Sequence, residues 1–181
     1  ADYRLYTAGD DFRHIDWGVY GRTDRLYVRQ FRDETDLNVL LLLDASTSMA
    51  HPAGEKKFAL ARDLAIALGY VALASGDSVT FAVLGQRATP KYRGAKALPK
   101  VFRELDAIEP SGNFRFVDEV RAAAARLRMP GKCFLISDLL LEESEIVETL
   151  DHLRARNFEV AALQVLSPSE LRLGIESGEH T

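Results

Sequence analysis

The chain has 181 residues, of which 47% are hydrophobic and 28% charged, so it can bury a substantial core and is not intrinsically disordered. A formal net charge of −4 argues against a dedicated nucleic-acid binder. Every apolar run is shorter than the roughly 20 residues that a membrane-spanning helix requires, and the first residues do not resemble a signal peptide.

Taken in chain order, the sequence first shows a segment without long periodicity over residues 1–24 and a loosely alternating one over 25–31. Short apolar runs then alternate with helical patterns of 12 to 20 residues. The runs predict buried strands at 37–43, 79–84, 133–136 and 158–166. The patterns predict helices over 56–75, 97–108, 115–128 and 142–156. Residues 87–93 contain a proline and are typical of an edge strand.

Strands that alternate with helices indicate βαβ units. We therefore predict an α/β fold, a doubly wound and mostly parallel sheet with helices on both faces. Residues 37–181 would form this domain, and residues 1–36 an N-terminal extension packed on it. The single cysteine, Cys133, lies in a predicted strand, where we expect it to be a small buried hydrophobic side chain. One cysteine cannot form a disulfide within the chain, which favours a reducing compartment.

Polar residues follow the first buried strand directly. Asp44, Ser46 and Ser48 stand at alternate positions after Leu43. A carboxylate and two hydroxyls are hard oxygen ligands, which suit Mg²⁺, Mn²⁺ or Ca²⁺ better than zinc. The alternative interpretation is that Asp44 only ends the strand while one of the serines caps the next helix.

Two further loops are predicted to reach the same edge of the sheet. Asp138 follows the strand at 133–136, and Asn113 lies in a loop before a helix. In open α/β sheets, ligands bind outside the carboxyl ends of the strands, near the point where the strand order reverses. Convergence of three loops favours a metal site over a simple strand end.

The segment from Gly9 to Trp17 is rich in charge. We interpret Asp10, Asp11 and Asp16 beside Arg13 as a local cluster of ion pairs and helix caps, because an arginine within the cluster opposes the binding of a cation.

The sequence lacks the motifs of several classes of enzyme. A G-x-x-x-x-G-K-[ST] phosphate loop and a G-x-S-x-G nucleophile elbow do not occur, and the four histidines have no zinc-type spacing. We therefore predict that the protein is not an enzyme. A metal-dependent phosphoesterase acting through Asp44 and Asp138 remains the alternative, although the sequence shows no acid–base partner for it.

Two signatures resemble a known family. Asp44-Ala45-Ser46-Thr47-Ser48 is similar to the D-x-S-x-S motif of von Willebrand factor A domains. Gly9-Asp10-Asp11-Phe12-Arg13-His14-Ile15-Asp16-Trp17 resembles the G-D-D-x-R-x-I-D-W motif of domain-of-unknown-function family 58, whose members carry it before an A-type domain. The resemblance covers roughly residues 3–166.

This resemblance implies a metal-ion-dependent adhesion site, with one Mg²⁺ (or Mn²⁺ or Ca²⁺) held by Asp44, Ser46, Ser48 and Asp138. The family usually places a threonine in the second loop, where this sequence offers Asn113, with Ser111 as a second candidate.

The resemblance also implies a partner, because family members are typically encoded beside MoxR-type AAA+ ATPases. We therefore predict a cytoplasmic, metal-dependent module that binds an acidic group of such an ATPase or its client. Any association with a membrane would need regions absent from this chain. A degenerate domain that binds partners without metal is a second alternative.

Overall fold

The computed structural model describes residues 2–30, 37–86, 89–127 and 131–172. The chain divides into two compact units, Ala1–Thr35 and Asp36–Thr181. That the first unit packs on the second stays a prediction.

The first unit is a small hairpin with two helical turns between its strands. The elements are β1 (Asp2–Leu5), η1 (Phe12–His14), α1 (Trp17–Thr23) and β2 (Tyr27–Gln30), and β1 pairs antiparallel with β2. Asp11 caps η1 by accepting a hydrogen bond from the Arg13 amide at 2.9 Å, and Asp16 caps α1 through the Val19 amide at 3.1 Å. The capping role predicted for these two carboxylates is confirmed.

Two ion pairs complete this charged segment. Asp11 binds the Arg13 guanidinium at 2.8 Å. The hydrogen bonds from the side chain and the amide of Arg13 lower the pKa of Asp11 to about 2. Asp10 does not join that pair: both of its oxygens accept from Arg4 at 2.6 Å. The cluster is therefore divided between two arginines, and Arg4 is a partner that the sequence did not reveal.

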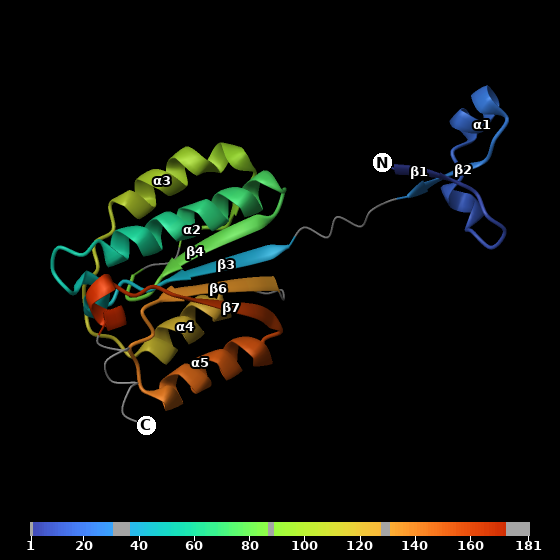
Figure 1. The fold of residues 1–181 in the computed structure, drawn as a ribbon. Coiled ribbons are helices and arrows are strands. Elements are labelled where there is room, and N and C mark those ends of the chain that lie inside the picture. Colours follow the sequence, from blue (N-terminus) through green and yellow to red (C-terminus); the bar gives the residue numbers. More distant parts are fainter. Residues whose placement is uncertain (1, 31–36, 87–88, 128–130, 173–181) are drawn as a thin grey trace. The chain divides into compact units, whose positions relative to one another are not determined.

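The second unit is built on a five-stranded sheet in the order β5-β4-β3-β6-β7 (Figure 1). Strands β3, β4, β6 and β7 are parallel, and β5 is antiparallel to β4. The strands are β3 (Asn38–Leu43), β4 (Ser78–Val83), β5 (Tyr92–Arg93), β6 (Gly131–Ser137) and β7 (Phe158–Gln164). All four predicted strands are confirmed, and β3, β4 and β6 are mainly buried. The predicted burial of the fourth strand is wrong: β7 lies at the edge of the sheet, and of its residues only Phe158 is buried. The predicted edge strand at 87–93 is reduced to β5, and residues 87–88 lie outside the described part of the chain.

Helices cover both faces of this sheet, with α2 and α3 on one face and α4 and α5 on the other (Figure 1). They are α2 (Lys57–Ala74), α3 (Leu98–Asp106), α4 (Phe116–Ala125) and α5 (Glu143–Ala155), and two 3-10 turns, η2 (Thr47–Ala50) and η3 (Ala95–Ala97), lie in the connections. The predicted α/β class, with a mostly parallel sheet, is confirmed.

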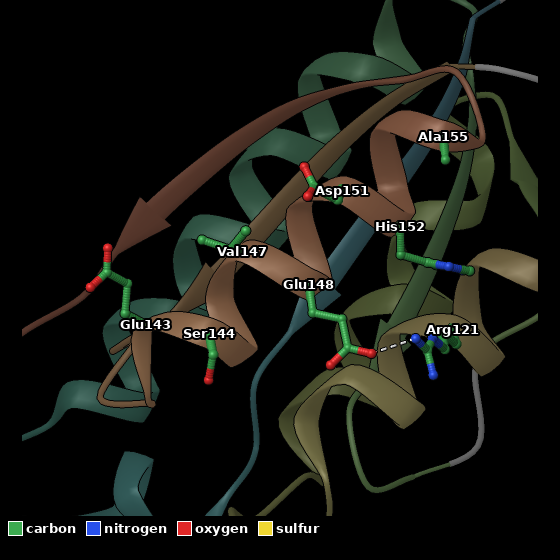
Figure 2. Close-up of a pocket in the computed structure, with 8 residues that line it drawn as sticks. All are labelled: Arg121, Glu143, Ser144, Val147, Glu148, Asp151, His152 and Ala155. Carbon is green, nitrogen blue, oxygen red and sulfur yellow. Dashed lines mark hydrogen bonds and ion pairs between the residues drawn. The ribbon is translucent and has the colours of Figure 1, made fainter.

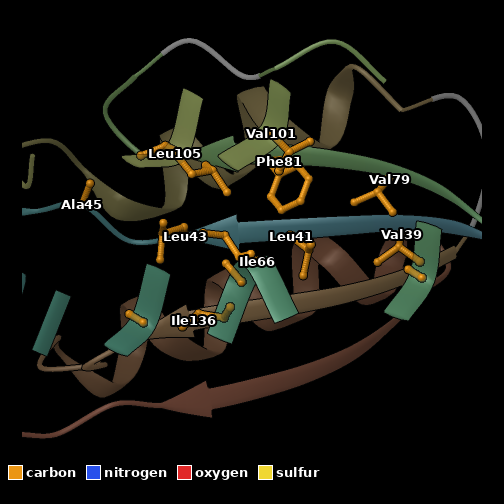
Figure 3. Close-up of a cluster of buried hydrophobic side chains, with 14 of the residues drawn as sticks. Val39, Leu41, Leu43, Ala45, Ile66, Val79, Phe81, Val101, Leu105 and Ile136 are labelled. Atoms are coloured by element: carbon orange, nitrogen blue, oxygen red, sulfur yellow. The ribbon is translucent and has the colours of Figure 1, made fainter. Parts of the chain in front are cut away.

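Alternation along the central strand divides the core in two. Val39, Leu41 and Leu43 of β3 belong to the cluster beneath α2 and α3 (Figure 3), whereas Leu40 and Leu42 belong to the cluster beneath α4 and α5. Successive side chains of a strand point to opposite faces, so a strand covered on both faces must be apolar at every position. This requirement explains the unbroken apolar run before Asp44.

Cys133 lies in the second of these clusters with no exposed surface, as the sequence predicted. Burial raises the pKa of its thiol to about 12, so the thiolate is suppressed near neutral pH.

Helix α2 approaches β4 closely at Gly69. A Cβ atom built on Gly69 would lie 2.4 Å from the Phe81 ring and 3.3 Å from Leu41 Cδ1. We expect Gly69→Ala to destabilise the protein by about 1–3 kcal/mol, because overpacking outweighs the roughly 1 kcal/mol that alanine gains over glycine inside a helix. Urea unfolding of Gly69→Ala alone and in a Phe81→Leu background checks this. If shortening Phe81 does not reduce the cost, the close approach is not its cause.

Candidate metal site

The loop after β3 brings the predicted oxygen ligands together. Ser46 and Ser48 have their hydroxyl oxygens 2.9 Å apart, and Asp44 Oδ1 accepts a hydrogen bond from the Ser46 amide at 2.8 Å. Ser46 sits at the start of η2 but makes no side-chain capping bond, and α2 begins only at Lys57. The alternative that these serines cap the next helix is therefore wrong, since their hydroxyls face each other instead.

Asp44 is almost completely buried, with 2% of its surface exposed. Its second oxygen, Oδ2, accepts a hydrogen bond from Ser137 Oγ at 2.6 Å. Burial raises the pKa of Asp44, the hydrogen bonds from Ser137 and Ser46 oppose that rise, and the charge of Asp138 adds to it. Asp44 therefore lies where negative charge is costly, and a cation would lower that cost.

Asp138 lies beside Asp44 because their strands are neighbours. Leu43 pairs with Ile136, and the Asp44 amide extends the ladder by donating to the Ile136 carbonyl at 2.9 Å. The chain moves from β3 to β4 on one side and reaches β6 on the other, so the strand order reverses between β3 and β6. Both carboxylates thus follow strands at the position where open α/β sheets bind their ligands.

Lys57, the first residue of α2, is bound to Asp138. Its ammonium lies 2.9 Å from Asp138 Oδ2 and 2.7 Å from Glu170 Oε1, and none of its side chain is exposed. Burial alone would lower the pKa of Lys57, but its hydrogen bonds and the two negative charges outweigh burial and raise it. One of the five predicted metal ligands is therefore already paired with a protein cation.

The second loop contacts the first one. The Ser111 amide donates to the Ala45 carbonyl at 2.8 Å, and Thr47 Oγ1 donates to the Gly112 carbonyl at 3.1 Å. Asn113 follows directly and is exposed. These bonds hold the loop beside the serines, while a metal-binding role for Asn113 or Ser111 stays a prediction.

A hard divalent cation fits the first loop. Asp44 and the two facing hydroxyls supply the oxygens that Mg²⁺ and Mn²⁺ prefer. Among the described residues, no group of three or more His, Cys, Asp and Glu side chains is arranged to hold a metal ion. Hydroxyl oxygens would therefore have to supply part of the coordination, and Ser46 and Ser48 are placed to do so.

Three residues of this site were missed by the sequence reasoning. Ser137 could have been found, because it immediately precedes Asp138. Lys57 carries a weaker signal: it is four residues before Ala61 and eight before Ala65, so it shares the buried face of α2. Glu170 carries none, since 113 residues separate it from Lys57.

A separate surface pocket lies on α4 and α5 (Figure 2). It is lined by Arg121, which binds Glu148 at 2.6 Å, and by a row of α5 side chains between Glu143 and Ala155. None of the five predicted metal ligands lines it. This pocket therefore does not belong to the candidate metal site.

The described part of the chain contains no helix that is both long and apolar enough to span a bilayer.

Two solved structures share the fold. They are an aerotolerance-related membrane protein from Bacteroides fragilis and the conserved hypothetical protein BatB from Bacteroides thetaiotaomicron. Each is 18% identical to this chain with a TM-score of 0.52, and the match covers 71% of this chain and 67% and 66% of theirs. The likeness supports the von Willebrand factor A-like fold predicted from the sequence, and at this identity it shows the fold alone.

Curated relatives are similar over nearly the whole chain. The uncharacterized proteins Rv1480 of Mycobacterium tuberculosis and Mb1516 of Mycobacterium bovis are each 29% identical to it in an alignment of 181 positions that covers 96% of this chain. The chain spans 56% of the length of these relatives. The family model described as "Protein of unknown function DUF58" matches residues 2–178, and the chain therefore belongs to the DUF58 family.

Proposed function

We propose that residues 37–181 form a metal-dependent protein-interaction module that binds an acidic group of a partner protein. The observation that carries this proposal is the convergence of Asp44 with the Ser46 and Ser48 hydroxyls, beside Asp138, at the reversal point of the sheet. Asp44, Ser46, Ser48 and Asp138, with Asn113 from the second loop, would hold one Mg²⁺ or Mn²⁺.

The chemistry of this site favours binding over catalysis. A divalent ion held by Asp44, two neutral hydroxyls and an Asp138 whose charge is shared with Lys57 keeps part of its charge, which attracts an incoming carboxylate. Asp138 is engaged by Lys57 and Asp44 by Ser137, so neither carboxylate is a free base for hydrolysis. A phosphoesterase therefore has less support than a binding module.

The partner class follows from the family resemblance. We propose a MoxR-type AAA+ ATPase or its client, acting with this protein in assembly or maturation. Basic side chains between Arg87 and Arg103, a stretch without any acid, would steer an acidic surface toward the module.

Removing one hydroxyl ligand tests this function. We expect Ser48→Ala to weaken binding to a purified MoxR-type ATPase by about tenfold or more, the size of effect found even for the outer partners of metal ligands. Binding to the immobilised ATPase should be measured in Mg²⁺ and in chelator. Ser144→Ala, an exposed serine of α5, is the matched control and should bind normally.

The alternatives give different results in the same assay. Binding that survives both chelator and Ser48→Ala would favour the metal-free interaction domain. Metal-dependent hydrolysis of a phosphate ester that is lost in Asp138→Ala would favour the phosphoesterase.

A further inference from the structure

Lys57 is a buried cation placed on a carboxylate of the candidate metal site. Its side chain has no exposed surface, and the two carboxylates that it binds are 2% exposed for Asp138 and 17% for Glu170. Glu170 belongs to a helical turn at residues 168–172, and its other oxygen, Oε2, accepts from the Ser167 amide at 2.8 Å. The Lys57 ammonium is thus held between Asp138, which follows β6, and the helical turn that contains Glu170.

A positive charge in this position opposes the arrival of a second one. Lys57 compensates Asp138 and, being buried, is poorly screened by water and salt. A divalent ion that draws on Asp138 must compete with the ammonium for Oδ2 and must also approach a like charge.

We propose that Lys57 is a built-in counter-charge that sets the affinity of this site for divalent cations by competing for Asp138. The inference rests on the metal site of the proposed function and adds the residue that regulates it.

Glu170 allows Lys57 to stay ion-paired when Asp138 binds a metal ion. When a metal ion attracts Asp138, the Lys57 ammonium still has Glu170 Oε1 at 2.7 Å and is not left unpaired in the protein interior. An unpaired buried charge is strongly unfavourable, so without Glu170 the lysine would hold Asp138 more firmly. Glu170 therefore makes the release of Asp138 possible.

Substitutions of Lys57 and of its partner Glu170 lead to opposite expectations. Lys57→Met removes the competing charge and should lower the Kd for Mn²⁺ by about tenfold or more. Glu170→Gln leaves Lys57 with Asp138 alone and should raise that Kd. If the triad only supported the fold, both substitutions would disturb the loops and weaken metal binding together. The opposite signs distinguish competition from support.

The experiment is calorimetric titration of the intact chain with Mn²⁺ alone, for wild type, Lys57→Met and Glu170→Gln. Lys57→Gln is a second test at the same position, in case methionine prevents folding. Lys132→Met is the matched control, because Lys132 lies at the opposite end of β6, is 42% exposed and binds only the exposed Glu159 at 3.6 Å among the interactions described; its affinity should equal that of wild type.

The outcomes separate this inference from the proposed function. Wild-type binding of Mn²⁺ with no tightening in either Lys57 variant would overturn the inference and leave the proposed function standing. Binding by the Lys57 variants but not by wild type would support the inference and overturn a metal-dependent function of the natural chain. Absence of binding in all variants would overturn both.

Discussion

Replacing Leu41 with alanine is expected to lower the free energy of unfolding by about 2–5 kcal/mol. Leu41 lies at the middle of β3, opposite Phe81 of β4 and Phe134 of β6, and has no exposed surface. The sheet and α2 surround it, so the space left by the shorter side chain cannot close without moving several elements (Figure 3). The cost therefore includes the lost burial and the cavity.

Leu60→Ala provides the matched control for this substitution. Leu60 lies on α2 but is 54% exposed, and the same chemical change there should stay within about 0.5 kcal/mol of wild type. Urea unfolding that follows the transition midpoint at constant m value measures both variants. Equal losses in the two variants would show that the described core does not dominate the stability of this unit.

Saturating Mn²⁺ is expected to stabilise the wild-type protein, by about 2.7 kcal/mol at a metal concentration one hundred times the Kd. The physical reason is the buried carboxylate of Asp44. Burial disfavours its ionised form, and the negative charge of Asp138 disfavours it further. In Asp44→Asn this metal-induced shift should disappear. Thermal unfolding of both proteins with Mn²⁺ and with chelator gives the comparison.

A change of aspartate to asparagine at the surface is the control for Asp44→Asn. Asp151 is 69% exposed on α5, where its described partner is Arg154 at 3.9 Å, and Asp151→Asn should keep the full metal-induced shift. The metal hypothesis fails if Mn²⁺ leaves the midpoint of the wild-type protein unchanged. It also fails if Asp44→Asn is stabilised as much as wild type.

The fold could be predicted because its determinants are local. The run from Val39 to Leu43 has to be apolar at every position once both faces are covered, and α2 carries its buried residues at helical spacing. The ends of the elements were less predictable. Helix α3 ends at Asp106, two residues before the predicted end at residue 108. A proline disfavours the helical conformation in the residue before it, so the helix ends ahead of Pro110.

The candidate site was predictable only where its residues follow strand ends. Asp44 and Asp138 could be placed on one edge because parallel strands end at the same side of a sheet. The ion pairs of Lys57 could not be predicted, since they join the start of α2 to β6 and to residue 170 across long stretches of chain. Side-chain pairing at that separation depends on packing and leaves no periodic pattern in the sequence.

The position of β3 at the centre of the sheet has a consequence for how the protein is made. Its two neighbours come from distant parts of the chain, and the Ser137–Asp44 hydrogen bond joins residues 93 positions apart. Contacts this far apart in sequence form slowly, because the chain loses the entropy of closing a long loop before the favourable contacts form. During synthesis, Asp44 leaves the ribosome well before β6 exists, with one edge of β3 still lacking its partner. The two carboxylates can meet only after β6 has paired, so any cation that needs both must bind late, as a ligand of the finished fold.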